Sequence, residues 1–188
     1  MARNLHFDLL APFYDRAIPP PSPQDYVDIL RLPISGDLLD VGGGTGRASA
    51  FLQSCVGRLV LCDLSFRMLQ QARLKDAHTC LRCRVQQLPF PPATFERVLV
   101  VDALHHFGDQ QRALASLLDV LKPGGRLVIE EPHGGTLPGK IIGWLEKLAL
   151  MGSHIHKPDQ IQNMIADLGY LSTIQPYGQY AVWITVDK

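Results

Sequence analysis

Short apolar runs alternate with helical stretches along most of the chain. The run at residues 97–101 is β-branched and continuous, as a strand buried on both faces of a sheet should be. Similar runs predict further strands at residues 37–41, 59–62, 80–84 and 126–130, of which the one at 80–84 is the weakest. Strands that alternate with helices favour a parallel sheet with crossover helices.

Helix signals stand between these strands. Ser65 and Asp109 are placed to cap helices, because their side chains can accept from the first backbone N–H groups of a helix. Gly169 is well placed to end the last helix. The expected helices cover residues 45–54, the segment after Ser65, residues 110–120 and residues 158–168.

The last third of the chain completes the expected sheet. The Lys-Pro-Gly-Gly sequence at 122–125 should turn the chain into the strand at 126–130, and two final strands flank a turn at 176–178 as a hairpin. The pattern therefore predicts an α/β fold, a Rossmann-like three-layer sandwich. Its seven-stranded sheet should be mostly parallel and end in an antiparallel hairpin strand. We expect one domain over residues 1–188.

Two segments lie outside this pattern. Residues 1–32 contain a proline run and a helix opened by Ser22-Pro23, and residues 133–157 separate the fifth strand from the last helix. Ligands of open α/β sheets bind outside the carboxyl ends of the strands, and both segments can reach that edge. We expect residues 1–32 to form a lid and residues 133–157 to lie near the substrate.

Composition and charge narrow the class of protein. Apolar residues make up 46% of the chain, which argues against disorder, and 18 basic residues balance 18 acidic ones. Because proteins that grip nucleic acid through phosphates carry a basic excess, we expect a small-molecule acceptor and no nucleic acid. The N-terminus has no apolar signal-peptide core and no apolar stretch is long enough to span a membrane, which predicts a cytoplasmic protein.

The four cysteines do not suggest a metal site. Cys80 and Cys83 have the spacing of half a zinc site, but there is no second pair. Residues three apart in an extended segment also point to opposite faces. We expect no metal and, in a reducing cytosol, no disulfide.

The most informative stretch is the glycine loop, Asp40-Val-Gly-Gly-Gly-Thr-Gly46, directly after the first strand. Glycines let a ligand approach the backbone closely, because no side chain intervenes. A dinucleotide-binding loop needs a third glycine where this chain has Arg47, and the Lys-Ser/Thr pair of a phosphate loop is missing. Asp40 would repel a pyrophosphate but suits a ligand with an ammonium group, such as S-adenosylmethionine.

Asp63 ends the second strand about twenty residues after the loop. A carboxylate at this position can accept from both hydroxyls of a ribose. A helix-capping or solvated aspartate is the alternative, and the preceding glycine loop favours ribose binding.

Six motifs, taken together and in order, resemble those of the class I S-adenosylmethionine-dependent methyltransferases. They are Leu39-Asp-Val-Gly-Gly-Gly-Thr-Gly46, Asp63-Leu-Ser-Phe-Arg-Met-Leu69, Leu88-Pro-Phe90, Phe95-Glu96, Leu104-His-His106 and Leu121-Lys-Pro-Gly-Gly125. Within that superfamily the chain is similar to the branch that contains the ubiquinone/menaquinone C-methyltransferases. Phe7-Asp8 and Tyr14-Asp15 resemble the N-terminal segment of that branch more loosely.

The resemblance implies methyl transfer with S-adenosylmethionine as the cofactor. It implies that the methionine end is held by Asp40, Gly42, Gly44, Thr45 and Gly46, with Val101 lining that pocket through its backbone. It also implies that Asp63 holds the ribose, that Leu64 and Met68 pack on the adenine face, and that Arg84 and Val85 meet the adenine edge.

Arg84 departs from the family pattern. The family usually has an acidic or amide residue there to accept from the adenine amino group, and arginine has no acceptor. Either Gln86 takes over, or the backbone reads the adenine, or the adenine sits differently.

The sequence leaves the catalytic residue unknown. Positioning two reactants can supply about 7–11 kcal/mol of a barrier, so a general base is helpful but not obligatory. The candidates are Tyr14, His106 and His133, with His154 and His156 in the insertion. Each has a structural alternative: Tyr14 can simply cover the cofactor, and the His105-His106 pair resembles a structural feature of the family.

The insertion bears on the acceptor. It combines an apolar helical face (Ile141, Ile142, Leu145, Leu148 and Ala149) with a side that carries Lys140, Trp144, Lys147 and Met151. Such a helix packs on the core, closes over an apolar substrate, or contacts a membrane surface. We expect an apolar or aromatic acceptor.

Two other functions remain to be separated from methyl transfer. A non-catalytic module that binds S-adenosylmethionine is supported by Arg84 and by the compact substrate region. A nicotinamide-dependent oxidoreductase is disfavoured by Arg47 and Asp40. The oligomeric state and the atom that accepts the methyl group stay open.

Overall fold

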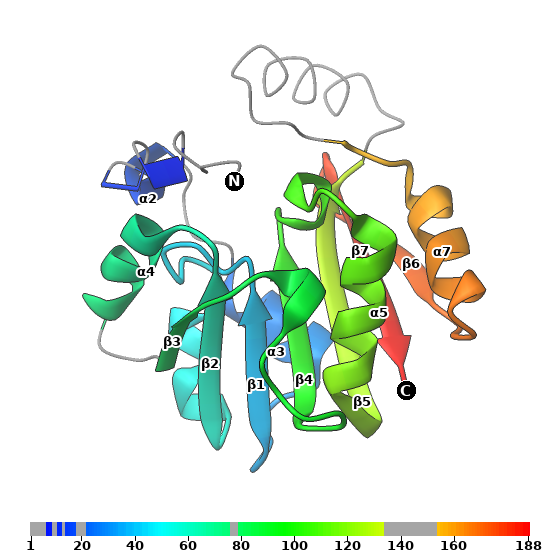
Figure 1. Cartoon of the computed structure of the whole chain (residues 1–188), viewed down its shortest axis with the longest axis horizontal. Helices are drawn as coiled ribbons and strands as arrows, with labels where there is room; N and C mark the ends of the chain where they lie inside the picture. The colour runs from blue at the N-terminus through cyan, green and yellow to red at the C-terminus, as the bar shows by residue number, and fades with distance from the viewer. Residues whose placement is uncertain (1–6, 9–10, 13, 18–21, 76–78, 134–153) are drawn as a thin grey trace.

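Seven strands form one sheet in the order β3-β2-β1-β4-β5-β7-β6 (Figure 1). The computed structural model describes residues 7–8, 11–12, 14–17, 22–75, 79–133 and 154–188. The strands are β1 (Asp37–Val41), β2 (Arg58–Asp63), β3 (Thr79–Arg82), β4 (Phe95–Val101), β5 (Leu121–Pro132), β6 (Thr173–Tyr177) and β7 (Ala181–Asp187). The first five run parallel, whereas β7 is antiparallel to both β5 and β6. The predicted fold class is confirmed.

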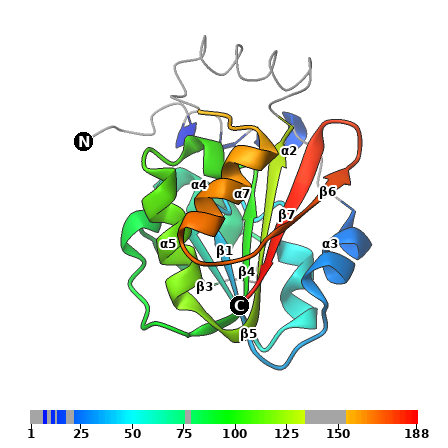
Figure 2. The same cartoon turned by 90° about the vertical axis from the view of Figure 1, so that its right-hand side faces the viewer.

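Helices cover both faces of the sheet. The α-helices are α2 (Tyr14–Ala17), α3 (Pro23–Leu30), α4 (Phe66–Arg73), α5 (Gln110–Val120) and α7 (Pro158–Asp167). Short 3₁₀ helices are η1 (Ala50–Cys55), η2 (Val85–Gln87) and η3 (Leu104–His106). Figure 2 shows the sheet nearly edge-on, with α5 and α7 on one side and α3 on the other, so the fold has three layers.

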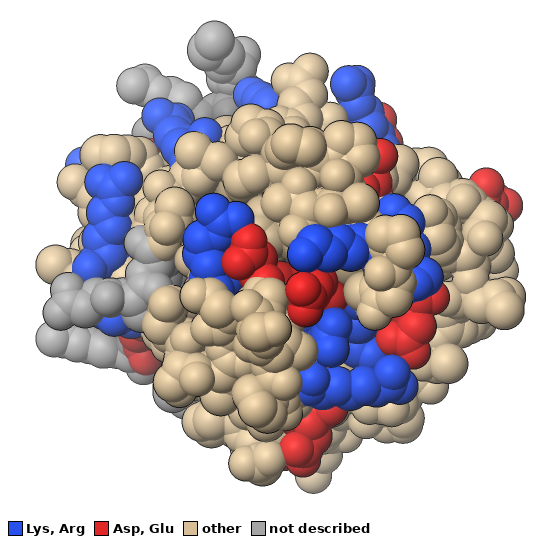
Figure 3. Space-filling view, turned by 90° about the horizontal axis from the view of Figure 1, so that it is seen from below, with Lys and Arg blue, Asp and Glu red and all other residues tan. Residues whose placement is uncertain are grey.

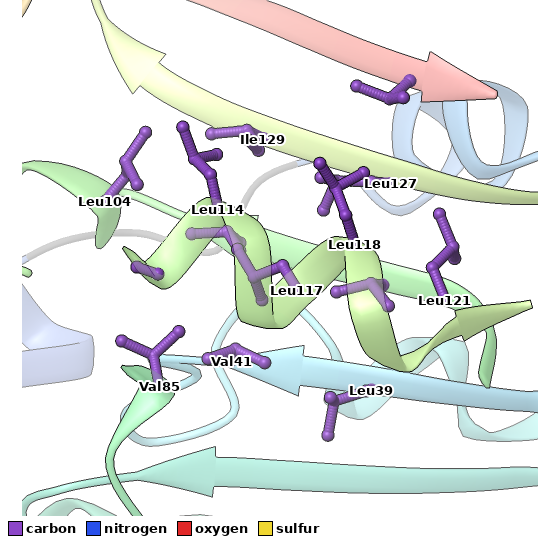
Figure 4. Close-up of a cluster of buried hydrophobic side chains, with 14 of the residues drawn as sticks. Leu39, Val41, Val85, Leu104, Leu114, Leu117, Leu118, Leu121, Leu127 and Ile129 are labelled. Atoms are coloured by element: carbon purple, nitrogen blue, oxygen red, sulfur yellow. The ribbon is translucent and has the colours of Figure 1, made fainter. Parts of the chain in front are cut away.

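The larger core lies between the sheet and α5 (Figure 4). Alternate residues of each strand point to this side because the side-chain period of a strand is two. The fully buried contributors include Leu39 of β1, Leu127 and Ile129 of β5, and Leu114 and Leu117 of α5. Burying one such side chain contributes about 1.5–3 kcal/mol, so this layer anchors the strands whose ends carry the site.

A second core lies under α3. Tyr26 and Leu30 of this helix are fully buried against Leu38, Leu59 and other apolar side chains of the sheet. The helix expected after Ser22-Pro23 is present as α3, but it packs on the sheet, so the lid expected of residues 1–32 does not include it. The sequence Tyr-Val-Asp-Ile-Leu carries enough apolar residues to pack on the sheet, which leaves only the chain before α3 for a lid.

Two predicted helix caps are confirmed. The Ser65 hydroxyl accepts from the backbone N–H of Met68 at 3.1 Å, and Asp109 Oδ1 accepts from the N–H of Arg112 at 3.0 Å. Gly169 follows α7 with φ +86°, a conformation that ends helices easily when the residue is glycine.

The α-helix predicted at residues 45–54 is wrong, because turns and a 3₁₀ helix take its place. Residues 44–49 make turns, and only η1 follows. Gly46 has φ +71°, which an α-helix starting at Thr45 does not allow. The glycines that make the loop close to a ligand therefore delay the helix.

Two predicted turns differ as well. β5 already begins at Leu121, and its register with β4 shifts between Phe95 and Arg97, so the Lys-Pro-Gly-Gly sequence lies within an irregular strand. The final hairpin turns at residues 178–180, after Pro176 and Tyr177 have joined β6. A proline is tolerated there because β6 is an edge strand.

The end of the molecule opposite the carboxyl ends of the parallel strands carries mixed charge. Figure 3 shows this end with blue and red side chains next to one another. Ion pairs join Arg126 to Asp187 at 2.8 Å, Lys122 to Glu96 at 3.3 Å, and Arg58 to Asp37. The basic groups named here are therefore matched by acidic neighbours.

Candidate functional site

A cavity of about 570 Å³ opens at the carboxyl ends of β1, β2 and β4. It brings together most of the residues that the sequence predicts for a ligand site. Those in its wall are Tyr14, Asp40, Gly42, Gly44, Asp63, Leu64, Met68, Arg84, Val85, Val101 and His106. Thr45 and Gly46 were expected there too, but they are not among the lining residues.

The glycine loop folds tightly over the end of β1. Gly42 has φ +71°, and a Cβ added to it would lie 2.6 Å from the Cβ of Ala103. A Cβ on Gly43 would lie 2.4 Å from Oδ2 of Asp40. Glycines are therefore required here by their own neighbours, and the loop covers the Asp40 carboxyl group.

Asp40 is a buried acid at the base of the cavity, only 1% exposed. Neither of its carboxyl oxygens has a hydrogen-bonding partner of standard geometry among the described residues. Burial, with a smaller contribution from the charge of Asp63, raises the pKa of Asp40 to about 7, although the Ser49 hydroxyl and Arg47 act to lower it. A buried carboxylate that lacks donors is costly, and a ligand cation offsets that cost. This site therefore fits the ammonium group of S-adenosylmethionine.

Asp63 joins the glycine loop to α4. Its Oδ2 accepts from the Gly44 N–H at 2.9 Å and its Oδ1 accepts from the Ser65 N–H at 2.7 Å. Burial raises its pKa, while these backbone donors lower it. Each carboxylate oxygen has a second lone pair, so Asp63 retains the capacity to accept from ligand hydroxyls.

The N-terminal segment is tied to the rim of the cavity. Asp8 accepts from the Ser65 hydroxyl, and Asp15 accepts from the Thr45 hydroxyl, both at 2.5 Å. Asp15 also pairs with Lys75 at 2.6 Å. Thr45 therefore anchors this segment in the structure instead of lining the cavity.

Aromatic side chains line part of the cavity wall. Phe7, Tyr14, His106 and Phe107 all lie in it. The Phe7 ring meets the His106 ring edge-on, with 4.9 Å between centroids. Gln86 also lines the cavity, and its amide nitrogen donates to the Asp109 carbonyl at 3.5 Å, so its amide oxygen is the acceptor atom available beside Arg84.

Several residues of the wall were not singled out from the sequence. Arg47 lines the cavity and pairs with Asp102 at 3.1 Å, and Cys62, Cys83 and Ala103 also contribute. Asp102 has φ +50°, and its N–H donates to the Glu130 carbonyl at 3.0 Å. Cys62, Cys83, Asp102 and Ala103 end or directly follow β2, β3 and β4, so the rule that ligands bind beyond strand ends would have found them, whereas Arg47 lies in the loop after β1.

The other histidine candidates lie apart from this wall. His133 follows β5, and its backbone N–H donates to the Tyr180 carbonyl at 2.7 Å. His154 and His156 line a second cavity of about 510 Å³ beside the start of α5. The apolar segment at 141–151, including Trp144, lies outside the described residues.

All four cysteines are free thiols. Within the described ranges, no group of three or more His, Cys, Asp or Glu side chains is arranged to hold a metal ion. None of the helices described above is long and apolar enough to cross a bilayer.

Comparison with known proteins gives a consistent picture. Residues 39–129 match the family described as methyltransferase domain. The chain is 30% identical over 167 residues to the ubiquinone/menaquinone biosynthesis C-methyltransferase of Cellvibrio japonicus, covering 72% of this chain and 67% of that protein. Across such relatives the chain spans about 40–67% of their length.

Solved structures share the fold at low sequence identity. The YcgJ protein of Bacillus subtilis superposes with a TM-score of 0.77 at 16% identity, covering 88% of this chain and 97% of that one. The phosphoethanolamine N-methyltransferase 2 of Haemonchus contortus, solved with S-adenosylmethionine, has a TM-score of 0.74 at 16% identity and covers 88% and 52%.

Proposed function

Because this chain belongs to the class I S-adenosylmethionine-dependent methyltransferases, we propose that it methylates a small apolar or aromatic acceptor. The Cellvibrio japonicus relative is a ubiquinone/menaquinone C-methyltransferase by name, which makes a reduced quinone ring the first acceptor to test.

One observation carries the proposal: the cavity combines two kinds of surface. Asp40 supplies a buried carboxyl group and Asp63 a part-buried one beside the glycine loop, whereas Phe7, Tyr14 and Phe107 supply aromatic surface. The first kind suits a cofactor with an ammonium and a ribose. The second suits an acceptor that is mostly apolar and is oriented by a few polar groups.

Different residues of the chain would bind different parts of the cofactor. Asp40 would hold the ammonium of the methionine end, with Gly42 and Gly44 lining its path, and Asp63 would accept from the ribose hydroxyls. Leu64 and Met68 would pack on the adenine, whose edge would meet Arg84, Val85 and Gln86. When bound, the cofactor supplies a methyl group on a positively charged sulfur, which an acceptor atom displaces in line.

His106 is our candidate for the group that handles the acceptor's proton. It lines the cavity beside Phe107, beyond the end of β4. A hydroxylated aromatic ring becomes a better carbon nucleophile when its O–H proton is removed, and a neutral imidazole can take that proton near neutral pH. Tyr14 also lines the cavity and would cover the cofactor or orient the same hydroxyl.

The test is a methyl-transfer assay with radiolabelled S-adenosylmethionine. We expect label in a reduced, short-chain menaquinone precursor that lacks the ring methyl, and none in histamine as a polar acceptor. The His106→Asn variant should lower turnover with the quinol by about 10²-fold or more while it still binds S-adenosylhomocysteine.

Two outcomes would contradict the proposal. Label transferred only to the polar amine would overturn the apolar acceptor. Tight binding of S-adenosylhomocysteine without transfer to any acceptor would favour a non-catalytic module that binds the cofactor.

A further inference from the structure

Glu131 is a buried carboxylate that faces the turn after β4. It lies near the end of β5, and its side chain is 2% exposed. It accepts three hydrogen bonds: from the N–H of Ala103 at 3.2 Å, from the N–H of Leu104 at 2.8 Å, and from Nδ1 of His105 at 2.6 Å. Because an ionised carboxylate only accepts, Nδ1 of His105 carries the proton in this pair.

All three donors belong to one short stretch of chain. Ala103 precedes η3, and Leu104 and His105 lie within it. The next residue, His106, lines the cofactor cavity, and its ring stands 4.0 Å from the His105 ring between centroids. A group that fixes Ala103 to His105 therefore also fixes the direction of His106.

Two other parts of the chain meet the same turn. The His154 N–H donates to the His105 carbonyl at 2.8 Å, which attaches the last residues of the 133–157 segment. The Phe7 ring of the N-terminal segment packs edge-on against His106. Phe7 also lines the cavity, so the orientation of the turn affects the part of the wall that Phe7 and His106 share.

We propose that Glu131 is a positioning residue for methyl transfer. Its three hydrogen bonds hold the 103–106 turn so that His106 points at the acceptor. This inference rests on the proposed function of His106, and Glu131 itself is not among the residues that line the cavity.

Glutamine tests this role sharply. A carboxylate offers two oxygens to three N–H donors, whereas a glutamine offers one oxygen and brings an NH₂ group that cannot accept. Glu131→Gln therefore keeps the size of the side chain and removes one of the two acceptor oxygens, so that the bond to His105 is either lost or reversed by a change of its tautomer. The matched control is Glu130→Gln, one residue earlier on the opposite face of β5, where Oε2 accepts from both Tyr26 and Trp183.

The first readout needs no acceptor. Long-range ¹H–¹⁵N spectra of the histidine rings should show His105 protonated at Nδ1 in the wild-type chain. Glu131→Gln should shift the ring signals of both His105 and His106, and Glu130→Gln should move neither. Calorimetry with S-adenosylhomocysteine should give dissociation constants within twofold of wild type for both variants.

The second readout is the split between kcat and KM with the reduced menaquinone precursor. Glu131→Gln should lower kcat at least tenfold and change KM less than threefold, and Glu130→Gln should change neither by more than twofold. Should Glu131→Gln not fold, His105→Phe removes one of the three bonds and keeps the ring, and it should shift the His106 signals with a smaller fall in kcat.

The outcomes separate the two proposals. Unchanged His106 signals and unchanged kcat in a folded Glu131→Gln variant would overturn the positioning role. If the wild-type chain transfers methyl to no acceptor, the proposed function fails, and the ring spectra still decide whether Glu131 orients His106.

Discussion

Two buried acids, Asp40 on β1 and Glu130 on β5, have similar pKa values and opposite surroundings. Burial raises the pKa of each to about 7. Glu130 accepts from the Tyr26 hydroxyl and from Trp183 Nε1 at 2.8 Å, within a cluster of aromatic rings. Asp40 has no donor at standard hydrogen-bonding geometry among the described residues, although the Ser49 hydroxyl acts to lower its pKa, and it faces the cavity.

The comparison shows that a shifted pKa does not by itself identify a functional acid. Both groups would be flagged as functional by the shift alone, since such shifts gather at active sites. The donors distinguish them: Glu130 uses its carboxylate to join α3 and β7 to β5, whereas the Asp40 carboxylate faces the cavity, where we propose that it meets a ligand. On this proposal, the same burial supports the fold in one region and binding in the other.

Removing the Glu130 side chain should give the largest effect. Glu130→Ala leaves the Tyr26 hydroxyl and the Trp183 N–H buried without their acceptor, so the free energy of unfolding should fall by about 2–4 kcal/mol. Urea denaturation followed by tryptophan fluorescence measures this. Glu130→Gln, which keeps an acceptor for both donors, should cost under about 1 kcal/mol. If both variants lost the same free energy of unfolding, the hydrogen-bond acceptor at residue 130 would not be the source of the stability.

The same kind of change at Asp40 should act on binding instead. Asp40→Asn removes the charge that would meet the ligand ammonium, so S-adenosylhomocysteine should bind about 1.5–3 kcal/mol more weakly. The free energy of unfolding should stay level or rise, because a buried charge has been removed. Calorimetry and urea denaturation test both parts. A folded variant with wild-type affinity would assign Asp40 to the loop structure alone.

Dependence on pH should follow from both acids. Each has a folded pKa near 7, above its ordinary value of 3.8 or 4.5, so the folded chain holds more protons than the unfolded one between about pH 4.5 and 7. Stability of the ligand-free protein should therefore fall as pH rises across this window, by up to about 1.4 kcal/mol per unit from each acid, and level off above it. Affinity for S-adenosylhomocysteine should rise over the same window, as Asp40 ionises.

The Asp40→Asn variant separates the two acids in that experiment. It should keep the part of the stability slope that comes from Glu130 and lose the rise in affinity. A rise that persists without the Asp40 carboxyl group would place the titrating group elsewhere.

The smallest effect is expected for Asp15, in the N-terminal segment at the rim of the cavity. Asp15 pairs with Thr45 and Lys75 at partly exposed positions, so Asp15→Ala should weaken S-adenosylhomocysteine binding by at most about 1 kcal/mol. Asp28→Ala on α3, which removes only an exposed contact with Gln24, is the control and should leave affinity unchanged. If Asp15→Ala lost as much affinity as Asp40→Asn, the N-terminal segment would contact the ligand directly.

Local signals predicted much of the fold. Continuous apolar runs located the strands, and Ser65 and Asp109 marked helix starts because each cap is a contact within three residues. Gly46 was misread because its positive φ depends on the loop's tertiary packing. α3 was misplaced because nothing in its own sequence says that Tyr26 will meet a carboxylate 104 residues away.

The candidate site was predicted where motif and strand end coincide, as for Asp40 and Asp63. Glu130 and Glu131 could not be told apart in sequence, because consecutive strand residues face opposite sides and only the topology says what lies on each. The Arg47–Asp102 pair, 55 residues apart, was likewise beyond sequence reasoning.

At position 102 the chain carries an aspartate, although the backbone conformation there favours a glycine. Its left-handed backbone conformation would suit glycine better, by about 1 kcal/mol. Glycine there would give up the carboxylate that holds Arg47 at the wall of the cavity. A screen that selects only for heat resistance would tend to choose the glycine, and with it a looser ligand site. Thermostability and substrate handling should therefore be selected together at this position.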